Sequence, residues 1–132
     1  MRQIQMMTLF LRKLIARMLK REEDGETDGM LEMIKNEFQN ELKINLDELV
    51  VLQDEGFFSI LKEKQFTENH LEDLAQLFML AGKTDDIEFS LTRRNYLQKA
   101  MAIYQKLERE SHNYSFERND KIRQIHQMLN GF

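Results

Sequence analysis

Apolar residues follow the spacing of a helix from the first turn of the chain. Within residues 2–21 they recur at steps of three and four. The positions are Ile4, Met7, Leu11, Leu14 and Met18, with Phe10, Ile15 and Leu19 widening the stripe. Residues with this spacing share one face of an α-helix, so the pattern predicts a strongly amphipathic helix.

The same spacing returns four times in the rest of the chain. The stripes are Met30, Ile34, Phe38 and Leu42; Leu71, Leu74, Ala75, Phe78 and Met79; Leu97, Ala100, Met101, Tyr104 and Leu107; and Ile122, Ile125, Met128 or Leu129, and Phe132. The stripe from Met30 to Leu42 continues or restarts through residues 46–52. A short apolar turn, residues 57–61, follows an expected interruption at Gly56. Proline, which ends helices, is absent, and there are only five glycines. We therefore expect an all-α protein of five or six antiparallel helices with short joints.

Several polar residues and one glycine mark expected helix boundaries. The hydroxyl groups of Thr67 and Ser115 suit N-caps, because they accept hydrogen bonds from free backbone N–H groups. Gly82 suits a C-cap. The helix after it begins at Thr84 or at Ser90, since either residue is able to cap it.

The helices around Gly82 resemble a tetratricopeptide repeat. Leu74-Ala75, Phe78 and Gly82 are similar to the first helix of that repeat, and the run KAMAIYQKL places Ala100 and Tyr104 as in its second helix. The resemblance implies a hairpin over residues 67–114 within a right-handed superhelix or a bundle. It also implies an interaction module.

Two features of the sequence depart from the tetratricopeptide pattern, and the C-terminal tail carries a second resemblance. The segment between Gly82 and Ala100 is about 13 residues longer than the repeat allows. His112 stands where the family usually has proline. The tail ESHNYSFERNDKIRQI resembles the closing helices of a small, uncharacterised bacterial family of tetratricopeptide-like proteins, which has no known activity to transfer.

Length and charge define one domain with two unequal parts. A chain of 132 residues fits a single α-helical domain, residues 1–132. Residues 2–21 carry six basic and no acidic residues, whereas the rest of the chain carries 13 basic and 23 acidic residues, a charge of −10. We therefore expect a basic helix over residues 2–21, a linker over 22–29 and an acidic helical body over 30–132. Nucleic acid is not an expected partner, because the acidic body repels phosphate.

The linker EEDGETDG has some of the spacing of a calcium-binding loop. Asp24, Glu26, Asp28 and Gly29 match the first, third, fifth and sixth positions of an EF-hand. The twelfth position requires a bidentate Glu, and here it is Lys35. We therefore expect no calcium site, and we expect Thr27 or Asp28 to cap the next helix.

No other pattern indicates a metal, a cofactor or catalysis. The three histidines are far apart in sequence, and Asp85, Asp86 and Glu88 fit the acidic first turn of a helix. There is no phosphate-binding glycine loop and no cysteine. We expect a protein that is not an enzyme, has no catalytic residues, cofactors or metal, and resides in the cytoplasm.

The N-terminal helix is the candidate interaction element. Its candidate contact residues are Phe10, Leu11, Leu14 and Met18, with Arg12 and Arg17. In one interpretation the stripe packs into its own core and the basic face meets the acidic body. In the other it contacts a protein or peptide partner, a second copy in a homodimer, or a membrane surface. We expect a protein-interaction or scaffolding module, with a peripheral membrane protein as the alternative and a small-ligand binder or enzyme as a third.

Overall fold

The described chain is entirely helical outside its turns. The computed structural model describes residues 2–83, 90–111 and 114–130, and this part of the chain contains no strand. Its helices are α1 (Arg2–Glu23), α2 (Met30–Leu42), α3 (Leu46–Val50), α4 (Asp54–Glu63), α5 (Glu68–Ala81), α6 (Ser90–Glu110) and α7 (Phe116–Asn130). The all-α prediction is confirmed, although α3 and α4 raise the number of described helices to seven.

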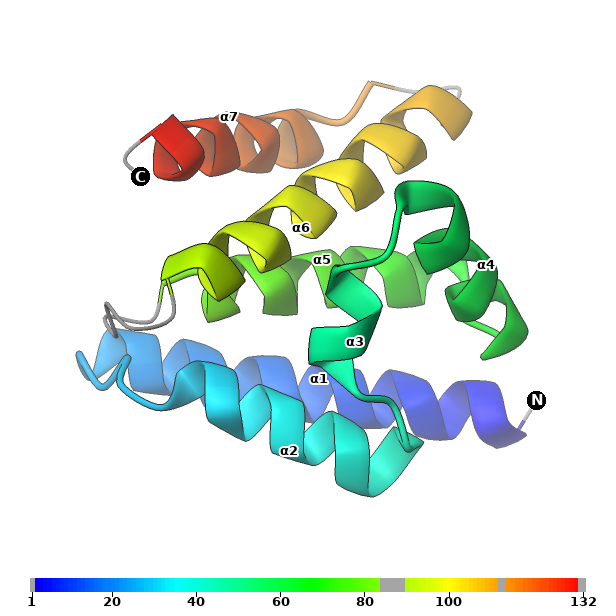
Figure 1. The fold of residues 1–132 in the computed structure, drawn as a ribbon, viewed down its shortest axis with the longest axis horizontal. Coiled ribbons are helices and arrows are strands. Elements are labelled where there is room, and N and C mark those ends of the chain that lie inside the picture. The colour runs from blue at the N-terminus through cyan, green and yellow to red at the C-terminus, as the bar shows by residue number, and fades with distance from the viewer. Residues whose placement is uncertain (1, 84–89, 112–113, 131–132) are drawn as a thin grey trace.

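Helix α5 lies at the centre of the fold. It packs against α6 on one side and against α1 and α2 on the other, and α7 covers the far side of α6 (Figure 1). The short helices α3 and α4 close the remaining side of this core. The largest fully buried side chains are aromatic and come from α2, α4, α5 and α6: Phe38, Phe57, Phe78, Tyr96 and Tyr104.

Two turns on the N-terminal side differ from the sequence prediction. Gly29 occupies the N-cap of α2 with φ 78° and without a side-chain cap bond, so capping by Thr27 or Asp28 was a wrong expectation. Gly56 does not interrupt a helix, contrary to the sequence prediction. It lies in the first turn of α4, after Asp54 and Glu55. Acidic residues in a first turn stabilise the positive end of a helix, which offsets the cost of a glycine there.

The predicted caps of α5 and α7 are confirmed. Thr67 Oγ1 accepts a hydrogen bond from the His70 amide at 3.3 Å, and His70 Nδ1 accepts one from the Thr67 amide at 3.1 Å. This reciprocal pair is a capping box that starts α5. Ser115 Oγ accepts from the Arg118 amide at 3.1 Å and starts α7. The first turn of α6 begins at Ser90, and the alternative cap, Thr84, lies outside the described residues.

Gly82 ends α5 for a reason other than backbone freedom. Its φ is −70°, which any residue adopts. A Cβ atom at this position would lie 2.4 Å from Leu97 Cδ2, well inside contact distance. Glycine is therefore required because α6 passes so close to the end of α5, and this contact fixes where the two helices meet.

Candidate functional site

The residues of the repeat-like signature lie together in the core. The five members other than glycine are fully buried: Leu74, Ala75, Phe78, Ala100 and Tyr104. The ring of Phe78 meets the ring of Tyr96 edge to face, with centroids 5.1 Å apart. These residues hold α5 against α6, so their role is packing and they form no open site.

The predicted apolar contact residues of α1 also belong to the core. Leu11, Leu14 and Met18 are at most 2% exposed, and Phe10 packs edge to face on Phe38 of α2 with ring centroids 5.4 Å apart. The stripe of α1 is therefore covered by α2 and α5 of the same chain. Leu11, Leu14 and Met18 are not available to a partner, whereas Phe10 is only partly buried.

Two predicted basic residues of α1 pair with the body. Arg12 Nε lies 3.9 Å from Asp73 Oδ2 of α5, and Arg17 lies 3.6 Å from Glu37 of α2. Burial raises the pKa of Asp73 even though the charge of Arg12 acts to lower it. The basic helix thus meets the acidic body, as one of the two interpretations of this helix expected.

A polar contact fixes the position of α1 along α5. His70 is 1% exposed. Its Nδ1 accepts a hydrogen bond from the Thr67 amide, so the proton of the neutral ring is on Nε2. Nε2 donates to Thr8 Oγ1 at 2.8 Å, and Thr8 Oγ1 donates to the carbonyl oxygen of Ile4 at 2.9 Å. The capping histidine of α5 therefore also binds α1.

The outer side of α1 carries apolar residues that no neighbour covers. Met6 is 63% exposed and Leu9 is 58% exposed, and Leu19, assigned to the buried stripe from sequence, is 41% exposed. Neither Met6 nor Leu9 was among the candidate contact residues predicted from the sequence. Their positions sit opposite the buried stripe, and that offset from Leu11 was the available signal.

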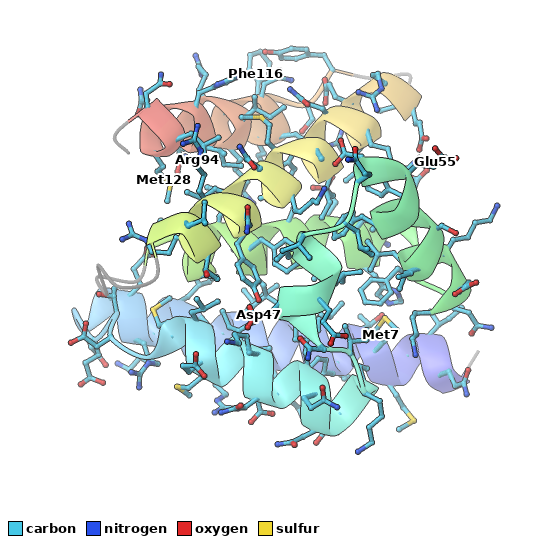
Figure 2. The ribbon with its side chains drawn as sticks, in the orientation of Figure 1. Met7, Asp47, Glu55, Arg94, Phe116 and Met128 are labelled. Carbon is cyan, nitrogen blue, oxygen red and sulfur yellow. The ribbon has the colours of Figure 1, made fainter. Side chains whose placement is uncertain are left out.

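A groove opens beside Met6 at the N-terminal end of α1. It has a volume of about 310 Å³. Its lining comes from α1, from the end of α2 and from the turn before α5: Gln3, Ile4, Met6, Met7, Phe10, Glu41, Leu42, Ile44, Lys64 and Gln65. Met7 lies on α1 near the chain that leaves α2 (Figure 2). Because thioether side chains are flexible and polarisable, this groove suits an apolar side chain of variable shape.

A second hollow lies further along the same two helices. It has a volume of about 420 Å³ and is lined by Ala16, Arg17, Lys20, Arg21 and Met33. Its floor is apolar and its borders are cationic. We use the name α1–α2 face for the exposed outer side of α1, from Met6 to Lys20, together with these two hollows.

Other polar clusters serve the fold. Arg118 of α7 donates to Glu72 of α5 and to Glu108 of α6, and its hydrogen bond to Glu108 holds the pKa of that carboxyl below its usual range. Lys99 donates to Asp54 at 2.7 Å over the ring of Phe57. Among the described residues no three metal-ligating side chains come together, and the acidic group of residues 85–88 lies outside them. None of the described helices has the length and apolar character to cross a membrane.

Comparison of the chain with protein-family models, with curated proteins and with solved structures finds no match.

Proposed function

We propose that this protein is a non-catalytic protein-interaction or scaffolding module that contacts its partner through the α1–α2 face. The observation that carries the proposal is the groove of about 310 Å³ beside Met6, with Leu9 exposed next to it. An apolar groove flanked by exposed apolar side chains is typical of a protein-binding surface. Charged side chains border this face, as in the rim of an interface.

The fold beneath this face supports a tetratricopeptide-like hairpin as its scaffold. Consecutive helices α5 and α6 pack closely, with small Ala75 and Ala100 fully buried between them. Gly82 permits the close approach of Leu97 at one end of the pair. We propose that this hairpin is the rigid support of the module, because repeat helices of this class present neighbouring helices to a partner.

The proposal is tested with surface variants in a pull-down from the native host. Met6→Asp with Leu9→Asp places two charges on the α1–α2 face without touching the core. We expect at least one protein to copurify with the wild type and to be lost from this double variant. Val51→Asp is the matched control, since Val51 is 66% exposed and lies outside that face. Identical sets of copurified proteins from all three would contradict the proposal.

A peripheral membrane protein is the second candidate. The side chain of Arg12, three residues from exposed Leu9, is 67% exposed, and that of Lys20, further along α1, is 70% exposed. Cations beside apolar residues attract anionic lipid. Cosedimentation with vesicles of anionic phospholipid separates the candidates. The interaction module predicts no more bound protein with anionic than with neutral vesicles.

A further inference from the structure

We infer that the α1–α2 face binds an acidic amphipathic helix of a partner protein. This inference rests on the proposed function and names the chemistry of the partner. Three observations carry it: the shape of the face, the order of its apolar and charged parts, and the cations that the fold leaves available.

Both hollows border a line along α1, and the first is also lined by Ile44, Lys64 and Gln65. Residues 3–10 of α1 border the first and residues 16–21 border the second. At a rise of 1.5 Å per residue, their centres lie about 18 Å apart along α1, which equals about 12 residues of a second helix. A helix lying along this line places side chains in both hollows, as helices do when they bind in grooves.

The chemistry of the two hollows differs, which gives the bound helix a direction. Methionine and phenylalanine side chains line the first, where Glu41 and Lys64 are of opposite charge. Arg17, Lys20 and Arg21 border the second. The fitting helix therefore carries a large apolar side chain at one position and Asp or Glu about 12 residues away.

Three cations of this face remain accessible to the carboxylates of a partner. Lys13 is exposed and has no ion pair among the described residues. Arg17 and Lys20 lie 3.6 Å from Glu37 and Asp24, longer than a hydrogen bond, with side chains 51% and 70% exposed. Carboxylates of a partner are therefore able to approach all three.

Shape and charge disfavour the two other occupants. The first hollow is deep enough to hold a side chain, whereas a flat bilayer surface contacts mainly exposed residues such as Leu9 and Lys20. A second copy that docks through its own α1 offers no acidic side chain from residues 2–21 to these cations. An acidic helix satisfies both the shape and the charge.

The test uses synthetic peptides with the full-length protein. One peptide of about 20 residues carries a leucine stripe with Glu at the other positions, and its matched control has Lys in place of Glu. Binding is measured by fluorescence anisotropy at two salt concentrations. We expect saturable binding of the Glu peptide, weakened by salt, and at least about tenfold weaker binding of the Lys peptide.

Protein variants locate the binding. Leu9→Asp, and separately Lys13→Gln with Lys20→Gln, should each weaken binding of the Glu peptide by about tenfold or more. Val51→Asp should leave it unchanged, and circular dichroism checks that every variant is folded. Equal affinity for both peptides, or unchanged binding by Leu9→Asp, would overturn the inference.

Two further measurements identify another occupant. Dimerisation in light scattering that Leu9→Asp abolishes would assign the face to a second copy, and vesicle binding that the lysine variants abolish would assign it to a membrane. Either result, without binding of the Glu peptide, overturns the acidic helix. A host protein lost from the Met6→Asp and Leu9→Asp variant, without peptide binding, would retain the proposed function and reject only the partner chemistry.

Discussion

Gly82 and Leu97 occupy one contact between α5 and α6 that leaves no room for a methyl group. A Cβ atom at Gly82 would lie 2.4 Å from Leu97 Cδ2 and 2.6 Å from Leu97 Cγ. Leu97 is fully buried, so other core side chains surround it. We expect Gly82→Ala to lower the free energy of unfolding by about 1–3 kcal/mol, measured by urea denaturation.

The control for this prediction removes the neighbour. In a Leu97→Ala background, which is itself destabilised, the added methyl group at position 82 has space, so Gly82→Ala should cost much less. Equal costs in the two backgrounds would show that the penalty comes from the backbone and would contradict the steric explanation.

Asp73 should make stability depend on pH in an unusual direction. Burial raises its pKa in the folded protein, so the folded state binds this proton more tightly than the unfolded state. The charged carboxylate therefore lowers stability above its folded pKa, and that loss is relieved as pH falls toward the unfolded value near 4. We expect Asp73→Asn to be at least as stable as the wild type at pH 7, with the difference in stability shrinking by pH 4.

Urea denaturation of both proteins at the two pH values checks this prediction. A variant less stable than the wild type at pH 7 would show that the pair with Arg12 dominates.

Local capping was readable from the sequence, whereas long-range polar contacts were not. Thr67 and Ser115 bind backbone amides three residues ahead, so their pattern lies within one turn. Arg118 and Glu72 are 46 residues apart, and nothing local to either residue indicates the other. The partner of a charged side chain depends on how whole helices pack, which the sequence pattern does not contain.

At the scale of the elements, α1 is positioned on α5 by the hydrogen bond between Thr8 and His70. Replacing Thr8 with Val keeps the side-chain shape but leaves the buried Nε2–H of His70 without an acceptor. We expect Thr8→Val to lower the free energy of unfolding by about 1–3 kcal/mol and to speed hydrogen exchange in α1. Thr8→Ser retains the hydroxyl and should stay close to the wild type in hydrogen exchange. Equal behaviour of the two variants would contradict a role for the hydrogen bond.

The same helix shows where helical periodicity stops being informative. Apolar residues of α1 occur around more of its circumference than α2 and α5 cover, so the pattern alone does not decide which of them stay exposed. Leu19 was expected in the buried stripe and is 41% exposed, whereas Leu11 is fully buried. The exposed members are set by the positions of two other helices. The two hollows of the α1–α2 face, which also need residues of other elements, therefore could not be predicted from residues 2–21.

For the whole molecule, the opposite charges of α1 and the body should make stability sensitive to salt. Arg12 and Arg17 pair with Asp73 and Glu37 at 3.9 and 3.6 Å, with the arginine side chains more than half exposed. Exposed pairs are screened by salt and are each worth up to ~1 kcal/mol. We expect the urea midpoint to fall between about 0.05 and 0.5 M sodium chloride, where the Debye length shortens severalfold. Arg12→Gln with Arg17→Gln should respond less, and an equal salt response would place the charge effect elsewhere.

The position of α1 against α5 also imposes an order on synthesis. Thr8 and His70 are 62 residues apart, and a ribosome adds roughly 5–20 residues per second, so α1 waits about 3–12 s for the helix that covers it. During that interval the apolar stripe of the nascent helix has no native neighbour from α5. A chain interrupted before residue 68 contains α2 but lacks the α5 surface that covers the rest of this stripe. Because α1 is made before α5, it completes its packing only after α5 has been made, and a shorter nascent chain exposes part of the apolar stripe of α1.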